Sequence, residues 1–509
     1  MMNDTALLSQ GGIVFLCIYI LSLILIGWLG KKARQKNTLS DFYLAGRGMG
    51  MLVLFLTLYA TQYSGNTLVG FAGRAYREGY QALVLVTMLS AAVGAFVIYA
   101  PKLYLLSKKY KFITPADYLK HRFNHKHLTF FAAALCLMAL ANYILTNLKA
   151  IGFIVVAVTG GAIPFAYGII ALSLVMVIYE TLGGMRSVAW TDAIQGTILM
   201  VGVVTIFITI NIEYGGFEFI YERLSTAQPE KFISPTLNQK LNWFSTICLG
   251  FFGISLYPHA IQRIYSANSI FTLKRSIQVM SFMPLITTLF MVVVGLTALA
   301  LFPNLNRAES EGATLLVLQN LVQRGAIGDG MMVLFLSATI AAIMATVDSA
   351  LLSMSSIITK DFYSYYRPEI KEERLTQVGK IISWCIMAIA VYLAIVLPQT
   401  IWRLLEIKLE LLIQIAPPIF LGLFNHQIKA KSTSNHYQIK ITTKSNQKQI
   451  MSQIKSNQNQ IKVKSNQTQI KSISNQNQTK VKSQSYQNNI KSNRQQIKSK
   501  SNRNQSQIK

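Results

Sequence analysis

The chain has 509 residues, of which 52% are hydrophobic and only 13% are charged, and its mean hydropathy is +0.38. Soluble domains carry about 25% charged residues, so this composition argues against a water-soluble enzyme. The net charge of +28 would favour a nucleic-acid-binding protein if it were spread along the chain. It is concentrated instead, because residues 425–509 hold seventeen Lys or Arg and no Asp or Glu. No nucleic acid is therefore expected as a partner.

Apolar runs long enough to cross a bilayer recur along residues 1–424. They predict an all-α polytopic membrane protein with about eleven transmembrane helices. No small-residue cleavage site follows the first run, whereas Lys31 and Lys32 do, which indicates a retained helix rather than a signal peptide. The predicted spans are 12–30, 50–78, 81–107, 128–158, 162–180, 187–212, 243–266, 276–302, 329–358, 376–397 and 404–424.

The connections between these spans differ in charge. Those after the first, third, fifth, seventh and ninth spans hold most of the connecting Lys and Arg, for example Lys31, Lys108 and Arg275. Cytoplasmic connections of membrane proteins carry the excess of basic residues. We therefore expect a multi-pass protein of the plasma (inner) membrane, embedded in the lipid bilayer, with its N-terminus outside and its C-terminal tail in the cytoplasm.

Two of the predicted spans carry interruptions. The second contains Tyr63-Ser-Gly-Asn66 in mid-membrane, and the seventh contains Gly250, Gly253 and Pro258. If the first span stands apart, these are the first members of two sets of five. Broken helices at corresponding places in two halves indicate an inverted-repeat secondary transporter with a site near the membrane midplane. The alternative is that Gly and Pro are common in membrane helices without any such meaning.

Four motifs follow one another along the chain and together span nearly all of residues 12–424. They are DFYLAGR at Asp41–Arg47, GGMRSVAWTDAIQ at Gly183–Gln195, PHAIQR at Pro258–Arg263, and AAIMATVDSALL at Ala341–Leu352, which runs on to KDFY at Lys360–Tyr363. In this order, the chain resembles the sodium:solute symporter family, whose members carry proline, pantothenate, sugars or monocarboxylates. The resemblance implies a five-plus-five inverted-repeat core of the leucine-transporter type with one extra N-terminal helix.

The resemblance also implies a sodium site between the broken second span and the ninth span. Its matching ligands are the backbone carbonyls of Ala60, Tyr63 and Ala342 and the hydroxyl of Thr346. Oxygen ligands of this kind suit Na+, the expected coupling ion. Position 345 is alanine where the family usually has serine, so one ligand is missing. Either sodium binds more weakly with water in the gap or it does not bind, and the small residues here could instead form a close-packing face.

Asp192 and Asp348 are carboxylates within predicted spans, where ionisable residues indicate function. By resemblance, Asp192 lies on the path by which sodium leaves towards the cytoplasm. The alternative is an ion pair with Arg186, six residues away. Asp348 is expected to pair with a cation on a neighbouring helix or else to line the cytoplasmic water path.

The solute is expected between the two broken helices. Candidate contacts are Ser64, Asn66, Tyr143, Lys149, Tyr257 and Ser349. For Lys149, the alternative is that its amine reaches the outer interface. Phe251 and Phe252 are candidate gates, and Gln62 replaces an aspartate of the proline-type members. Glu406, Lys408 and Glu410 are interpreted as marking the outer end of a short last span.

No catalytic motif is found, so the sequence predicts a carrier and not an enzyme. The primary hypothesis is sodium-coupled symport of a small organic solute, an amino acid or organic acid such as proline or pantothenate, by alternating access. Alternatives are a membrane sensor on the same fold, a proton-coupled carrier favoured by Ala345, and a truncated inactive relative.

Residues 425–509 are predicted to form a disordered tail rich in Asn, Gln, Ser and Lys, distinct from the transmembrane domain at 1–424. One interpretation is electrostatic attraction to anionic lipids of the inner leaflet. The other is an altered terminus without a selected role.

Overall fold

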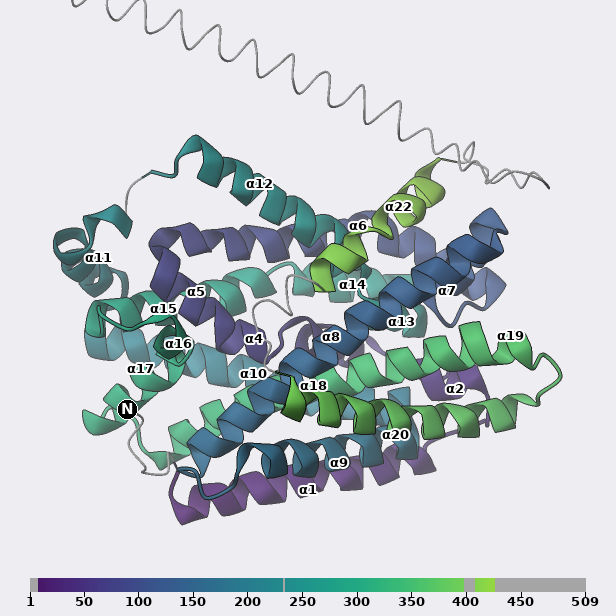
Figure 1. The fold of residues 1–509 in the computed structure, drawn as a ribbon, viewed down its shortest axis with the longest axis horizontal. Helices are drawn as coiled ribbons and strands as arrows, with labels where there is room; N and C mark the ends of the chain where they lie inside the picture. The colour runs from purple at the N-terminus through teal and green to yellow at the C-terminus, as the bar shows by residue number, and fades with distance from the viewer. Residues whose placement is uncertain (1–7, 232–233, 398–407, 426–509) are drawn as a thin grey trace, which may run out of the picture. The chain divides into compact units, whose positions relative to one another are not determined.

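A computed structural model describes residues 8–231, 234–397 and 408–425. Glu406 and the predicted tail beyond Asn425 lie outside these residues, so both interpretations of the tail stay predictions. Within them the chain is helical, and its only β-type pairing is one parallel bridge between Met49 and Ala267. That bridge joins the chain just before the first broken helix to the end of the second. The N-terminal helix α1 (Gln10–Lys32) lies beside α9 (Phe165–Gly183) (Figure 1).

Helices of the first half begin with the extra N-terminal one. In chain order they are α1 (Gln10–Lys32), α2 (Leu39–Leu44), η1 (Ala45–Arg47), α3 (Met51–Gln62), α4 (Gly65–Leu68), α5 (Gly70–Glu78), η2 (Gly79–Leu83), α6 (Val84–Tyr110), α7 (Pro115–Phe123), α8 (Lys126–Val158), α9 (Phe165–Gly183), α10 (Met185–Tyr214), α11 (Gly216–Ala227) and η3 (Pro229–Lys231).

Helices of the second half follow the same sequence of long elements. They are α12 (Leu237–Phe252), η4 (Ile254–Leu256), α13 (Pro258–Ser266), α14 (Ile270–Met280), η5 (Pro284–Thr288), α15 (Leu289–Leu301), α16 (Arg307–Ser310), α17 (Ala313–Gln323), α18 (Asp329–Ile357), η6 (Ile358–Tyr363), α19 (Ser364–Tyr366), α20 (Glu372–Val396) and α22 (Ala416–Phe424).

Among the described residues, eight helices are long and apolar enough to cross a membrane, and the bent pair α12–α13 makes a ninth. The predicted second span is not among them as a single helix, because it is divided into α3, α4 and α5. The predicted last span begins outside the described residues. Large apolar side chains of α1, such as Phe15, Ile18 and Leu25, are exposed, as expected for a helix that faces lipid.

Both predicted interruptions are real breaks. The helix that starts at Met51 stops at Gln62 and restarts at Gly65, so its hydrogen-bond ladder opens between these residues. In the second half, the axis bends by 54° between α12 and α13. Pro258 opens α13, where its missing N–H costs no helix hydrogen bond.

The packing of the broken helices repeats between the halves. The first broken helix packs through α5 on α15, and the second packs through α12 on α6, so the first helix of each half contacts the second helix of the other half. Glycine permits both contacts. A Cβ on Gly250 would lie 2.3 Å from the carbonyl oxygen of Met88, and one on Gly295 would lie 2.2 Å from that of Ala72. This reciprocity is what a five-plus-five inverted repeat requires.

Candidate functional site

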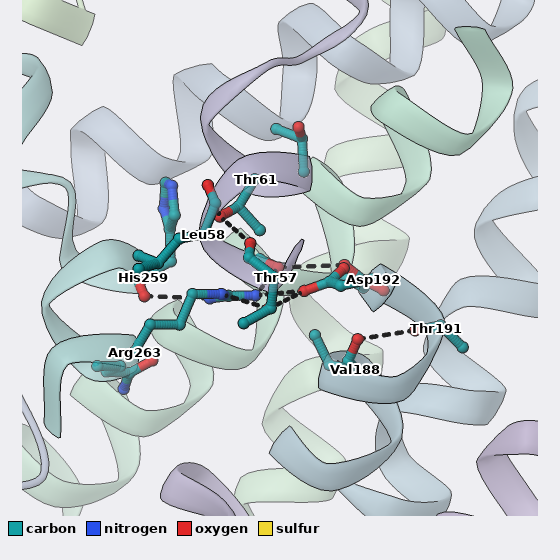
Figure 2. A network of polar contacts seen from close by, with 12 residues as sticks. Thr57, Leu58, Thr61, Val188, Thr191, Asp192, His259 and Arg263 are labelled. Atoms are coloured by element: carbon teal, nitrogen blue, oxygen red, sulfur yellow. Dashed lines mark hydrogen bonds and ion pairs between the residues drawn. The ribbon is translucent and has the colours of Figure 1, made fainter. Parts of the chain in front are cut away.

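A buried ion pair joins the two halves (Figure 2). Nη2 of Arg263 on α13 lies 2.7 Å from Oδ2 of Asp192 on α10, and both side chains are 0% exposed. Arg263 also donates from Nε to the hydroxyl of Thr57 on α3 at 2.7 Å and from Nη1 to the carbonyl of His259 at 3.0 Å. Thr57 donates to Asp192, and Arg263 donates to Ser349 on α18. Four helices are thereby tied to one guanidinium group.

Such a pair is stable only because its hydrogen bonds are nearly complete. Removing two charges from water costs several kcal/mol per ion, which their attraction offsets only in good geometry. Arg263 donates from all three of its guanidinium nitrogens. Asp192 is less satisfied, since its Oδ1 has no hydrogen-bond partner among the described residues. The carboxylate therefore keeps one oxygen available for a further ligand.

The alternative pairing of Asp192 with Arg186 is wrong. Arg186 contacts Asp41 instead, with 2.9 Å between Nη2 and Oδ1. The two residues lie near the start of α10, but six residues correspond to about 600° of helix rotation, which turns their side chains to different faces. Asp41 belongs to α2 and Arg186 to α10, so this ion pair holds α2 against the start of α10.

Among the described residues Asp348 pairs with no cation, so the first of its two predicted roles, an ion pair with a neighbouring helix, is not found there. Its Oδ2 accepts a hydrogen bond of 2.6 Å from the hydroxyl of Tyr179 on α9, and none of the ion pairs among the described residues includes it. Ser349 next to it accepts from Arg263, so this candidate solute contact belongs to the ion-pair network.

The predicted sodium ligands lie where the first broken helix meets α18. Ala60, Tyr63, Ala342 and Thr346 are all buried. The two helices approach closely, since a Cβ on Gly65 would lie 2.2 Å from Cγ1 of Ile343. The Thr346 hydroxyl donates to the carbonyl of Ala342 at 2.9 Å, which leaves its oxygen lone pairs free to face a cation. Ala345 is also buried and offers no ligand atom.

An aromatic cluster lies beside this region. It comprises Tyr143 of α8, Tyr257 in the second break, His259 of α13 and Lys408, and we call it the Tyr–His–Lys cluster. The Tyr143 ring lies 5.4 Å from that of Tyr257 and 5.7 Å from that of His259. Its hydroxyl donates to the carbonyl of Thr61 at 3.4 Å.

The Tyr143 hydroxyl also lies close to the side chains of Ser64 and Thr346. Tyr143 therefore connects the candidate solute contacts with the candidate sodium ligands. All three residues are buried, so the described conformation is closed around this region.

Other candidates lie elsewhere. Lys149 donates to the carbonyl of Leu397 at the end of α20, about 9 Å along α8 from Tyr143. Phe251 stacks on Phe420 of α22 with ring centroids 5.7 Å apart, and Phe252 meets the same ring edge-on at 5.3 Å. The side chain of Asn66 lies outside the described part of the structure.

The sequence analysis missed three side chains of this region. Lys408 is 2% exposed with its amine on the Tyr143 ring, a buried contact that its interpretation as a marker of the outer end of a span did not include. Arg263 lies within a quoted motif, and a charged residue inside an apolar span was the available signal. No local pattern distinguishes His259 from any other buried histidine.

Comparison with known proteins agrees with this architecture. The profile of the sodium:solute symporter family matches residues 42–433, so the chain belongs to that family. It is a multi-pass membrane transporter and not an enzyme.

Curated relatives cover most of the chain. It is 25% identical over 430 residues to an uncharacterised symporter, YhjB, of Bacillus subtilis (strain 168), covering 84% of this chain and 85% of the relative. It is 27% identical over 429 residues to the sodium/pantothenate symporter of Escherichia coli (strain K12), covering 82% and 86%. It is also 27% identical over 394 residues to sodium/proline symporter 2 of Staphylococcus saprophyticus, covering 75% of each.

Among solved structures, a Na+-coupled sialic acid symporter in a substrate-bound outward-open state superposes with a TM-score of 0.68 at 22% identity. The match covers 82% of this chain and 88% of that one. It confirms the predicted fold class.

Proposed function

We propose that this protein carries a small organic solute, an amino acid or organic acid, into the cell together with Na+ by alternating access. The relatives named for pantothenate and proline symport support a solute of this size. For the orientation in the membrane, we propose that the N-terminus lies outside the cell and the tail lies in the cytoplasm, as the charges of the connections between spans predict. The ion-pair network around Arg263 then lies on the cytoplasmic side of the Tyr–His–Lys cluster.

The observation that carries the proposal is the position of Tyr143 between the first break and Thr346. An opened helix supplies carbonyl oxygens for a cation, and the polar groups next to it supply contacts for a solute. A single hydroxyl that bonds to the first broken helix and lies close to Thr346 would let the binding of each ligand affect the other. Such a contact is what thermodynamic coupling of two ligands requires.

The network of Arg263 would act as the cytoplasmic gate. While Asp192, Thr57 and Ser349 hold the guanidinium group, α3, α10, α13 and α18 are closed together. When α13 moves away, Asp192 loses its counter-ion and offers its carboxylate to the departing Na+. The unpartnered Oδ1 supports this exit role.

The driving force is sufficient at one Na+ per cycle. One charge crossing about 100 mV releases about 2.3 kcal/mol. A tenfold sodium gradient adds about 1.4 kcal/mol. Their sum of about 3.7 kcal/mol holds a solute without net charge, such as a zwitterionic amino acid, concentrated several-hundred-fold. With a monovalent carboxylate anion the cycle moves no net charge, so the sodium gradient alone, about 1.4 kcal/mol, concentrates it about tenfold.

Proteoliposomes test the proposal. The purified full chain is reconstituted, and uptake of labelled pantothenate, proline and lactate is followed with an inward Na+ gradient or an equal K+ gradient. The proposal predicts concentrative uptake of at least one compound in Na+ only, and its loss when an ionophore collapses the gradient. Uptake that is equal in the two salts contradicts sodium coupling.

A proton-coupled carrier is the second candidate, and Ala345 favours it because the side chain contributes no oxygen to the sodium region. It predicts that an inward pH gradient drives uptake without sodium. The same vesicles distinguish the two candidates.

A further inference from the structure

Lys408 is a buried cation in the region between the two broken helices. It lies in the helical residues 408–413 that precede α22, and its side chain is 2% exposed. Its Nζ lies 3.4 Å from the centroid of the Tyr143 ring and 5.0 Å from that of Tyr257. The amine is therefore placed on the two tyrosines that face the candidate solute region.

Among the described residues, no acidic side chain pairs with the Lys408 amine. No ion pair of Lys408 occurs within residues 8–231, 234–397 and 408–425. Two aromatic faces attract an ammonium group, but more weakly than a buried ion is penalised by leaving water. A buried lysine in a membrane protein marks a functional site whose anionic partner has to be identified.

A second observation comes from His259. Its ring lies 5.1 Å from that of Tyr257, its side chain is 0% exposed, and both ring nitrogens lack a hydrogen-bond partner among the described residues. Buried polar atoms are nearly always paired, so an imidazole with neither nitrogen bonded to a described residue, close to a buried lysine, indicates that a polar partner from outside these residues completes the site. Imidazole and ammonium together suit an oxygen-rich anionic group.

We propose that Lys408 binds the carboxylate of the transported solute, with His259 as a second hydrogen-bonding group, so that the protein selects carboxylates over neutral compounds. The inference rests on the proposed symport and names the residues that recognise the carboxylate of its solute. A negatively charged solute bound to Lys408 would also offset the positive charge of Na+ bound at the first break. Each ligand would then strengthen the binding of the other.

The test measures the melting temperature of the detergent-purified full chain in sodium chloride. The probes are pantothenate, lactate, pyruvate and proline at millimolar concentration, together with pantothenol and lactamide as uncharged counterparts of the first two. At least one carboxylate is expected to raise the melting temperature, whereas its uncharged counterpart does not. In Lys408→Gln the apparent affinity for that carboxylate falls at least about tenfold, which corresponds to about 1.4 kcal/mol.

Two further variants complete the design. Lys102→Gln is the matched control, because Lys102 is an exposed lysine whose amine also lies on an aromatic ring, that of Phe424 at 3.9 Å. It is expected to bind the carboxylate as the unsubstituted chain does. Lys408→Arg keeps the charge and is expected to keep the preference for carboxylates, which controls for a folding defect in Lys408→Gln.

Three results overturn the inference. They are unchanged carboxylate affinity in folded Lys408→Gln, equal stabilisation by the uncharged counterparts, and no response to any of the carboxylates although sodium alone raises the melting temperature. Sodium coupling is assessed separately. Carboxylate binding that depends on Lys408 but is the same in potassium chloride supports the inference and contradicts the sodium symport.

Discussion

Neutralising Asp192 gives the most direct energetic test of the ion-pair network. Asp192→Asn keeps the shape of the side chain but leaves the guanidinium group of Arg263 buried without its counter-ion. Both side chains are 0% exposed and 2.7 Å apart, so water does not replace the lost charge. Breaking a fully buried pair by removing one partner costs about 3–5 kcal/mol. Because asparagine still accepts hydrogen bonds, we expect a loss near the lower value.

The control is an exposed pair in the same chain. Arg324 and Glu213 lie 3.5 Å apart, with 48% and 30% of their side chains exposed. Solvent screens this pair, so Glu213→Gln should cost at most about 1 kcal/mol. Midpoints of unfolding by heat, and by SDS titration in mixed micelles, measure both variants.

The double variant Asp192→Asn with Arg263→Gln completes the cycle. It removes both buried charges, so its loss should be clearly smaller than the sum of the two single losses. The reasoning is refuted if Asp192→Asn is no more destabilising than Glu213→Gln, or if the two single losses simply add.

Further predictions concern the close helix contacts and the sodium region. Gly65→Ala brings a Cβ within 2.2 Å of Ile343, so it should cost about 1–3 kcal/mol of stability, and adding Ile343→Ala should recover part of the loss in the melting temperature. Gly250→Ala meets the backbone carbonyl of Met88 instead, at 2.3 Å, so trimming the Met88 side chain should not restore its melting temperature. Ala345→Ser supplies the missing hydroxyl and should tighten sodium binding severalfold in a sodium titration of the melting temperature. An unchanged titration would mean that this position does not face the ion.

The breaks in the helices could be predicted from the sequence because their causes are local. Pro258 cannot continue a helix hydrogen-bond ladder, and α13 begins at that residue. Gly65 lies directly after the first break, at a point of close approach to α18. Span lengths follow from the thickness of the bilayer in the same way.

Partners far apart in sequence could not be predicted. Asp192 has Arg186 nearby in the chain, but it pairs with Arg263, which is 71 residues away. The alternation of Glu406, Lys408 and Glu410 does not indicate which side of the helix is buried. Only the packing shows that Lys408 contacts Tyr143, a residue of another helix.

One measurement tests the central claim, the coupling to sodium, without any knowledge of the solute. It compares the melting temperature of the purified protein in sodium chloride and in potassium chloride at equal ionic strength. A ligand that binds only the folded state stabilises it by about 2.7 kcal/mol at one hundred times its dissociation constant. We expect a rise in sodium that disappears in Thr346→Ala and persists in Thr346→Ser. Equal melting temperatures in the two salts would contradict a sodium site between the first broken helix and α18.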